Sequence, residues 1–471
     1  MVRNTLTAQA EERDLAQLDR LIAAHEKLLT DRMRCSLELR EAARATLAGG
    51  VASAWQDSQP GAIWIERGEG GRVWDADGTE YVDMHGGFGA GLAGHAHPAV
   101  VEAVERRVRM GTHFGHPTED LISVSRLLRD RFRLPLWRFS NSGTEATMDA
   151  VHLMRVATGR KKIIKVEGAY HGHHDSVQVS TFPTPEGTDI GPDHRPRSVP
   201  HGPAIPGEFV DLTVAVPFGD IDAARTVLEE NPDSVAGMII EPVMLNIGVV
   251  VPPASYLAEL VDLLHAHGAY LAYDEVKTGL AVAPGGATEL FGVTPDIVCL
   301  AKALGGGLPC GAIGGTAELM ELIADNTYQQ VGTFNGNPLT MAVARAMLTE
   351  VLTPEAYSHL EALRVAIVTG VEELMARYGI PGHVASVGAK GSVIFADRLR
   401  DYRDFLRSPA PWRRAHWLYQ VGGGILLPSW GKSEQFTLSV QHTTEDARLY
   451  VANFERLCRD VRPAQRPEVA S

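Results

Sequence analysis

Cysteine, positive charge and long apolar runs are all scarce in this chain of 471 residues. The four cysteines have neither metal-site nor redox-motif spacing, which favours reduced thiols and a cytoplasmic protein: Cys35, Cys299, Cys310 and Cys458. The 44 basic residues are outnumbered by 58 acidic ones, which argues against nucleic acid or an anionic membrane surface as a partner. No apolar run approaches the ~18 residues of a membrane span, and the N-terminus has no signal-type apolar core.

Helical stretches alternate with short apolar runs along most of the chain. The runs Lys162–Val166 and Val235–Ile240 are examples. Such alternation indicates βαβ units and a mostly parallel sheet, and 47 glycines with 27 prolines are typical of a loop-rich enzyme. We therefore expect an α/β fold whose large domain covers residues 116–338.

The N-terminal segment has a different pattern. Residues 5–48 contain neither glycine nor proline. Four apolar side chains recur there at helical spacing: Leu15, Leu18, Ile22 and Leu29. One or two amphipathic helices are predicted, forming an extension over residues 1–48. Docking on the protein's own dimer or small lobe is favoured over a role as a partner-binding arm.

A smaller domain is expected from the two ends of the chain. Residues 62–83 alternate apolar and polar side chains around turn signals, which predicts an antiparallel meander. After Pro338, long helical stretches reach about Gly379 and mixed short strands follow. We assign residues 49–115 and 339–471 to this small α+β domain.

Two glycine- or proline-rich stretches interrupt the regular pattern. The glycine density of residues 85–98 indicates close approach of the backbone to other groups rather than a strand. Residues 181–209 contain seven prolines, so no regular element is expected there. Long structureless loops of this kind are usually lids or binding loops.

Two buried strands are predicted to end abruptly at a charged residue. The run Ala269–Tyr273 stops at Asp274, and the run Ile297–Leu300 stops just before Lys302. Ligands gather at the carboxyl ends of strands in open α/β sheets, so both groups are expected to face one site. One interpretation is a structural ion pair, or caps on the elements that follow. The other is that they hold a pyridoxal phosphate ring from its two ends.

Four further constellations carry possible chemistry. Residues 139–146 place hydroxyls and a glycine before a helix, which suits either a phosphate cup or an ordinary N-cap. Residues 170–175 hold three histidines and an aspartate, but no distant ligand cluster completes a zinc site, and we expect no metal. Residues 241–246 end a buried strand, and residues 332–338 form a turn before a helix. The glycines at 305–307 lack the context of a dinucleotide-binding motif.

Taken in order, the motifs SNSGTEA, YHGHHD, EPVMLNIG, DEVKTG, AKALGGGLPCGA and GTFNGNP resemble the class III pyridoxal-phosphate aminotransferases. The branch that contains glutamate-1-semialdehyde aminomutase is the most similar one. The resemblance spans roughly residues 48–445 and implies PLP fold type I, the cofactor pyridoxal 5'-phosphate, and a homodimer with shared active sites.

The resemblance also implies roles for particular residues. Lys302 matches the Schiff-base lysine and Asp274 the partner of the ring nitrogen, while Tyr170 and Val276 would pack on the two faces of the ring. The phosphate would be bound by Ser142, Gly143 and Thr144, with Thr333 reaching it from the neighbouring subunit. Glu241 and Asn246 match polar residues beside the ring, and His171 belongs to the motif. We assign catalysis to Lys302, Asp274 and Tyr170.

The chain departs from the aminomutase pattern where that pattern binds its substrate. A stretch resembling PGGVNSPVR is replaced by AGGVASAWQ, which keeps Ser53 but has Gln56 in place of the arginine. Glutamine cannot replace a bidentate carboxylate clamp electrostatically, so this change argues against glutamate-1-semialdehyde as substrate. Our candidates for substrate contact are Trp55, Gln56, His85, Phe88 and Trp430.

These observations predict an aminotransferase that moves an amino group from an amine or amino acid to a carbonyl acceptor by a ping-pong Schiff-base mechanism. Two alternatives stay open. One is an aminomutase that transfers the amino group within a single molecule. The other is an idle cofactor-binding protein, against which the presence of both Lys302 and Asp274 argues.

Overall fold

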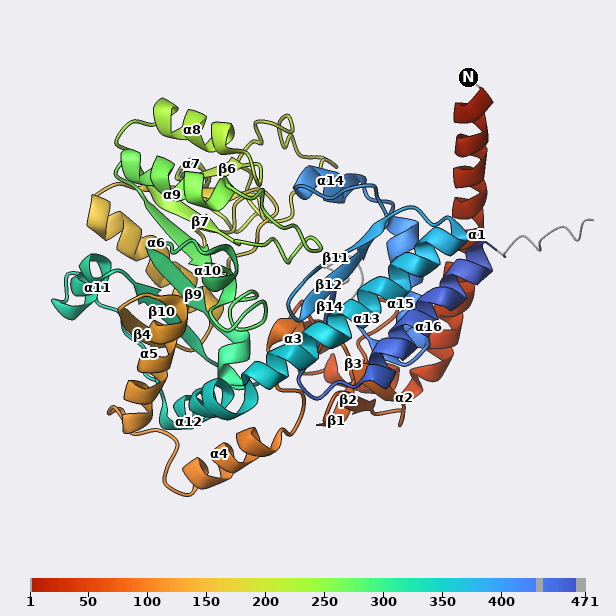
Figure 1. Cartoon of the computed structure of the whole chain (residues 1–471), viewed down its shortest axis with the longest axis horizontal. Helices are drawn as coiled ribbons and strands as arrows, with labels where there is room; N and C mark the ends of the chain where they lie inside the picture. The colour runs from red at the N-terminus through yellow and green to blue at the C-terminus, as the bar shows by residue number, and fades with distance from the viewer. Residues whose placement is uncertain (1, 429–434, 463–471) are drawn as a thin grey trace, which may run out of the picture.

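The computed structural model describes residues 2–428 and 435–462, with side chains described from residue 13 onward. Figure 1 shows two lobes side by side, with the long helix α13 (Pro354–Tyr378) starting beside the large lobe and running across the second. One lobe is built on a large sheet, and the other combines the two ends of the chain. No helix of the described residues is long and apolar enough to cross a membrane.

The large lobe contains a seven-stranded sheet in the order β4-β10-β9-β8-β7-β5-β6. Only β10 runs antiparallel to its neighbours, which confirms the mostly parallel sheet. The strands are β4 (Leu136–Ser140), β5 (Lys162–Val166), β6 (Thr213–Val216), β7 (Val235–Ile240), β8 (Tyr270–Asp274), β9 (Ile297–Leu300) and β10 (Gly311–Gly315).

Helices cover both faces of this sheet because its strands bury alternate side chains on opposite sides. Leu271 and Tyr273 of β8 belong to one apolar cluster and Ala272 to the other. The helices of this lobe are α4 (Pro98–Val108), α5 (Glu119–Phe132), α6 (Gly143–Thr158), α7 (Gly207–Asp211), α8 (Ile221–Glu230), α9 (Tyr256–Ala266), α10 (Gly286–Phe291), α11 (Ala317–Ala324) and α12 (Pro338–Ala346). Helices α6 and α11 pack on one face, and α5 and α9 on the other.

The second lobe joins segments from both ends of the chain. The predicted meander is present as the antiparallel strands β1 (Ile65–Glu69), β2 (Arg72–Asp75) and β3 (Glu80–Asp83). The late strand β13 (Ile425–Leu426) pairs with β3. A second sheet contains β11 (His383–Val387), β12 (Lys390–Ile394) and β14 (Gln435–Thr437).

The N-terminal segment forms the two predicted helices, α1 (Val2–Arg32) and α2 (Arg34–Ala43). Leu18 and Leu29 are buried, and α1 packs along α15 (Ala410–Gly422) of the second lobe. The extension therefore docks on its own chain. Leu15, at the same helical spacing, remains exposed.

Two expectations about regular structure need correction. The region after Gly379 contains three helices besides its strands, namely α14 (Tyr402–Arg407), α15 and α16 (Thr444–Val461). The proline-rich loop gives way to helix α7 at Gly207, because Pro206 is its last proline and serves as the N-cap. The glycine-rich stretch contains one helical turn, α3 (Gly86–Gly89), in which Phe88 has a φ of 57°.

Candidate cofactor and substrate site

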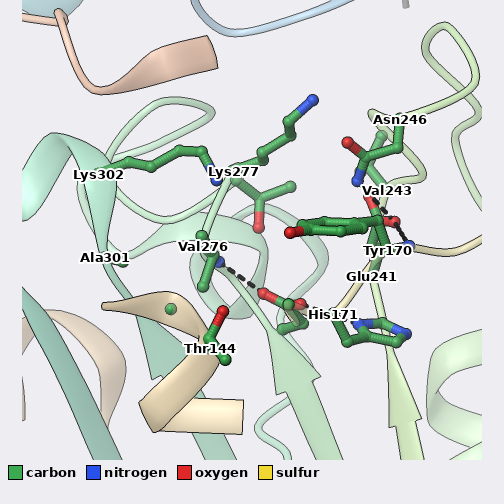
Figure 2. A pocket seen from close by; sticks show the side chains of 14 residues that line it. Thr144, Tyr170, His171, Glu241, Val243, Asn246, Val276, Lys277, Ala301 and Lys302 are labelled. Atoms are coloured by element: carbon green, nitrogen blue, oxygen red, sulfur yellow. Dashed lines mark hydrogen bonds and ion pairs between the residues drawn. The ribbon is translucent and has the colours of Figure 1, made fainter. Parts of the chain in front are cut away.

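A pocket opens where the carboxyl ends of β5, β7, β8 and β9 meet the start of α6. Figure 2 shows the side chains that converge on it. The residues that line it are Gly143, Thr144, Tyr170, His171, Gly172, Glu241, Val243, Asn246, Asp274, Val276, Lys277, Thr278, Ala301 and Lys302. The pocket thus unites most of the cofactor residues that the sequence predicted.

Asp274, the last residue of β8, is held in place by two donors. Its Oδ1 accepts a hydrogen bond from Val276 N at 3.0 Å, and its Oδ2 lies 2.8 Å from His171 Nδ1. Both side chains are buried. The Asp274 carboxylate contacts His171, and no ion pair joins it to Lys302 within the described residues, so the interpretation of Asp274 and Lys302 as a structural ion pair is not supported.

Glu241 organises the loops that follow β5 and β7. One carboxylate oxygen accepts hydrogen bonds from Tyr170 N at 3.0 Å and Asn246 Nδ2 at 2.8 Å. The other accepts from Leu245 N at 3.0 Å. A buried carboxylate with three donors is well stabilised, so Glu241 fixes the positions of both Tyr170 and Asn246.

Lys302 follows β9 directly and reaches into the pocket from the side opposite Tyr170 (Figure 2). Its backbone has a φ of 47°, a left-handed conformation that costs a non-glycine residue of the order of 1 kcal/mol. Burial lowers the pKa of Lys302, while the nearby carboxylates of Asp274 and Glu241 oppose this shift. A lysine with a depressed pKa has a larger neutral fraction, and the neutral amine is the form that attacks carbonyl carbons.

The start of α6 forms an anion-binding end of the pocket. Ser142 is the N-cap, and its Oγ accepts a hydrogen bond from Glu145 N at 3.2 Å. Gly143 and Thr144 line the pocket, whereas Ser142 stands just outside its lining. A Cβ on Gly143 would lie 2.8 Å from Val276 Cγ2, so only glycine lets the positive end of this helix approach so closely.

These groups fit pyridoxal 5'-phosphate. Backbone N–H groups at the start of α6 suit a phosphate, the Asp274 carboxylate suits a protonated pyridine nitrogen, and the Lys302 amine suits an aldehyde. Tyr170 and Val276 lie on different sides of the pocket (Figure 2), as expected for side chains that sandwich a flat ring.

The predicted substrate residues lie beside this pocket. The Trp55 ring meets the rings of Tyr170 and Phe88 edge-on, each at 5.3 Å. Phe88 and His85 line an adjoining hollow with Gln56. The Gln56 side chain turns back to its own loop, where its Oε1 accepts from Ala52 N at 3.1 Å.

The last two predicted residues are Thr333 and Trp430. Thr333 lies exposed in the loop before α12 and does not line the pocket of its own chain. Trp430 falls outside the described residues. No group of three histidine, cysteine or acidic side chains within the described residues could hold a metal ion.

Sequence reasoning missed two lysines. Lys277 lines the pocket three residues after Asp274, and its place in the DEVKTG motif was a usable signal. Lys390, in β12 of the other lobe, is fully buried. Nothing in its local sequence indicates that it approaches Lys302.

The family model Aminotransferase class-III matches residues 53–434. The glutamate-1-semialdehyde 2,1-aminomutase of Persephonella marina is 41% identical over 422 residues, which are 88% of this chain and 96% of that protein.

Two solved structures are similar over nearly their whole length. An omega-transaminase from Sphaerobacter thermophilus has a TM-score of 0.84 at 32% identity, covering 90% of this chain and 97% of that one. A glutamate-1-semialdehyde-aminomutase from Pseudomonas aeruginosa PAO1 in complex with PMP has a TM-score of 0.86 at 28% identity, covering 95% and 99%. Structures similar to this chain thus include both a transaminase and an aminomutase.

Proposed function

Because this chain belongs to the class-III aminotransferases, enzymes that use pyridoxal 5'-phosphate, we propose that it transfers an amino group from an amine or amino acid to a separate carbonyl acceptor. The observation that carries this proposal is the pocket in which Lys302 lies across from the paired Asp274 and His171, beside the anion-binding start of α6. An idle binding protein has no need of a half-buried lysine whose pKa is lowered.

Each residue has a task in this chemistry. When bound, pyridoxal phosphate supplies an aldehyde that captures amines and a pyridinium ring that withdraws electrons from the reacting carbon. Lys302 would hold the cofactor through its aldehyde carbon, and its Nζ, once freed by the substrate amine, would be the base that accepts the proton from the substrate carbon and delivers it to the cofactor carbon. Asp274 would hold a proton on the ring nitrogen, and His171 keeps the Asp274 carboxylate oriented.

We assign the reaction to two half-reactions, so the donor leaves as a carbonyl product before the acceptor enters. Gln56 supports a substrate other than that of the aminomutases, because its side chain is occupied by Ala52 N and carries no charge for a carboxylate. Tyr170 and Trp55 border the space where the donor would lie.

An aminomutase is the second candidate. The 41% identity over 88% of the chain to the enzyme of Persephonella marina favours it. An aminomutase moves the amino group within one molecule and therefore requires no separate acceptor.

A half-reaction separates these functions. Candidate amines are added one at a time to the cofactor-loaded protein without an acceptor, while the cofactor spectrum is followed and products are collected. We expect the spectrum to convert with release of one equivalent of carbonyl product. An isomerised amine without accumulating carbonyl product would identify an aminomutase. A full panel of amines that leaves the spectrum unchanged would support an idle binding protein.

We also propose a homodimer in which Thr333 completes the phosphate site of the other subunit, and a cytoplasmic location. Thr333 lies between Val331 and Phe334, two apolar side chains that are 83% and 57% exposed. Such exposure suits an interface. Sedimentation should show a dimer, and Phe334→Asp should shift it towards monomer with weaker cofactor binding. A wild-type monomer that retains the cofactor would contradict this proposal.

A further inference from the structure

Three lysines from different elements gather at the substrate side of the pocket. Lys277 follows β8 and Lys302 follows β9, and both line the pocket. Lys390 belongs to β12 and is fully buried behind them. A Cβ placed on Gly89 would lie 2.3 Å from Lys390 Nζ and 3.8 Å from Lys302 Cδ, so the two lysine side chains flank the same glycine.

Lys277 and Lys390 have few acceptors for their ammonium groups. Lys277 Nζ donates to Leu245 O at 3.3 Å, and Lys390 Nζ donates to Thr437 Oγ1 at 3.0 Å. By contrast Lys165, a buried lysine of β5, donates to three oxygens. Within the described residues neither Lys277 nor Lys390 has a carboxylate within ion-pair distance.

The carboxylates closest to these lysines already accept hydrogen bonds from other groups. Asp274 is held by His171 and Val276 N, and Glu241 accepts three hydrogen bonds. The described residues therefore offer the protonated Lys277 amine no carboxylate of its own. An unpaired ammonium in a buried site is costly, and a bound anion removes that cost.

The cofactor phosphate does not account for this charge. Its predicted cradle is at Thr144, whereas Figure 2 shows the Lys277 ammonium at the other end of the pocket. A substrate that carries an anion would supply this negative charge. A molecule that brings both an amino group and an anion to one pocket is an amino acid, and its carboxylate suits a compact ammonium donor.

We propose that Lys277 binds the carboxylate of an amino acid substrate, with the buried amine of Lys390 behind it. This inference rests on the proposed amino transfer and narrows its donor from amines in general to amino acids. Lys277 thereby supplies the positive charge that Gln56 lacks.

The site also has a pH signature. Burial and the nearby Lys302 lower the pKa of Lys277 to about 7. The charged or titratable groups that act on the cluster from the surrounding elements are Lys302, Lys390, His85, Asp274 and Glu241. A bound carboxylate raises the Lys277 pKa, so binding takes up a proton. Affinity is then greatest below about pH 7 and falls as the pH rises towards the pKa in the complex.

The test is a titration that requires no turnover. Protein loaded with pyridoxal phosphate is titrated calorimetrically with propionate and with uncharged propionamide. The wild type, Lys277→Met, Lys277→Arg and a control, Lys161→Met, are compared. Lys161 is exposed, lies outside the pocket, and its substitution removes the same charge.

We expect propionate to bind about tenfold or more weakly to Lys277→Met than to the wild type. Lys277→Arg should restore most of the affinity, Lys161→Met should match the wild type, and propionamide should not distinguish the variants. Equal propionate affinity in the wild type and Lys277→Met would overturn the proposal, and so would a wild type that binds no propionate. If propionate binds through Lys277 but the protein converts no amine, the proposed amino transfer is refuted, whereas the assignment of Lys277 as a carboxylate site stands.

Discussion

The cofactor side and the substrate side of the pocket differ in how their charges are satisfied. On the cofactor side, Asp274 and Glu241 receive hydrogen bonds from His171, Asn246 and backbone N–H groups. On the substrate side, Lys277 and Lys390 each have one hydrogen-bond acceptor among the described residues. The carboxylates of the cofactor side thus have their partners before any substrate arrives, whereas the lysines of the substrate side have no carboxylate partner among the described residues.

This contrast separates chemistry from specificity. Groups that act on every substrate are fixed by partners within the chain, because preorganised dipoles cost no reorganisation during reaction. Groups that select a substrate find their partner only in the ligand. Substitutions on the cofactor side should therefore lower turnover of all substrates, and those on the substrate side should change preference.

The largest effect is expected for Lys302→Ala. Removal of the amine abolishes both covalent capture of the cofactor and proton transfer, so turnover should fall by about 10⁴-fold or more. Borohydride followed by mass spectrometry should attach the cofactor to the wild type and to Lys161→Ala, but not to this variant. Near-normal turnover would rule out Lys302 as the reacting lysine.

The second-largest loss of turnover is expected for Asp274→Asn. The amide keeps the size of the side chain but cannot hold a positive charge on the ring nitrogen, so kcat should fall by roughly 10²- to 10³-fold. Cofactor binding should persist, because the α6 cradle and Lys302 are unchanged. Equilibrium dialysis and single-turnover kinetics measure the two quantities separately. Loss of cofactor with unchanged kcat at saturation would contradict this role.

A smaller loss is expected for His171→Leu. His171 touches Asp274 rather than the reacting atoms, so its removal should lower kcat by about 10- to 100-fold through misorientation of the carboxylate. His171→Asn, which retains an N–H donor, should recover part of this loss while KM stays unchanged. Equal kcat values for His171→Leu and His171→Asn would show that the hydrogen bond to Asp274 is not the cause of the loss.

The difference between the two sides also explains what the sequence alone could predict. Asp274 and Lys302 were identifiable because buried apolar runs stop at them. The contact between His171 and Asp274 was not, because it depends on β7 lying between β5 and β8. Lys390 was out of reach for a similar reason, since it enters the site from a strand of the other lobe.

The helices missed near the C-terminus have two separate causes. Helix α16 begins with a capping box in which Thr443 and Asp446 bond each other's backbone, a signal present in the sequence and overlooked. Helix α15 buries Arg414 and His416 together with its apolar side chains, so its pattern of polar and apolar residues does not show a helical period.

The last prediction concerns stability and compares two buried lysines, Lys390 and Lys165. Lys390→Met should raise the free energy of unfolding by about 1–3 kcal/mol, because it removes a buried amine with one partner. Lys165→Met is the matched contrast. It should lower the free energy of unfolding by about 2 kcal/mol or more, since three oxygens lose their donor.

The pH dependence of that stability gain identifies its cause. Burial, with Lys277 and Lys302 nearby, lowers the pKa of Lys390 well below its ordinary 10.5. At a pH between the lowered pKa of folded Lys390 and 10.5, Lys390 is protonated in the unfolded chain but not in the folded protein. The free energy of unfolding of the wild type therefore rises with pH in this range. Methionine does not titrate, and the advantage of Lys390→Met should shrink as the pH approaches 10. Urea unfolding at several pH values measures the difference in free energy of unfolding between Lys390→Met and the wild type. A difference that does not change with pH would show that packing rather than charge is responsible.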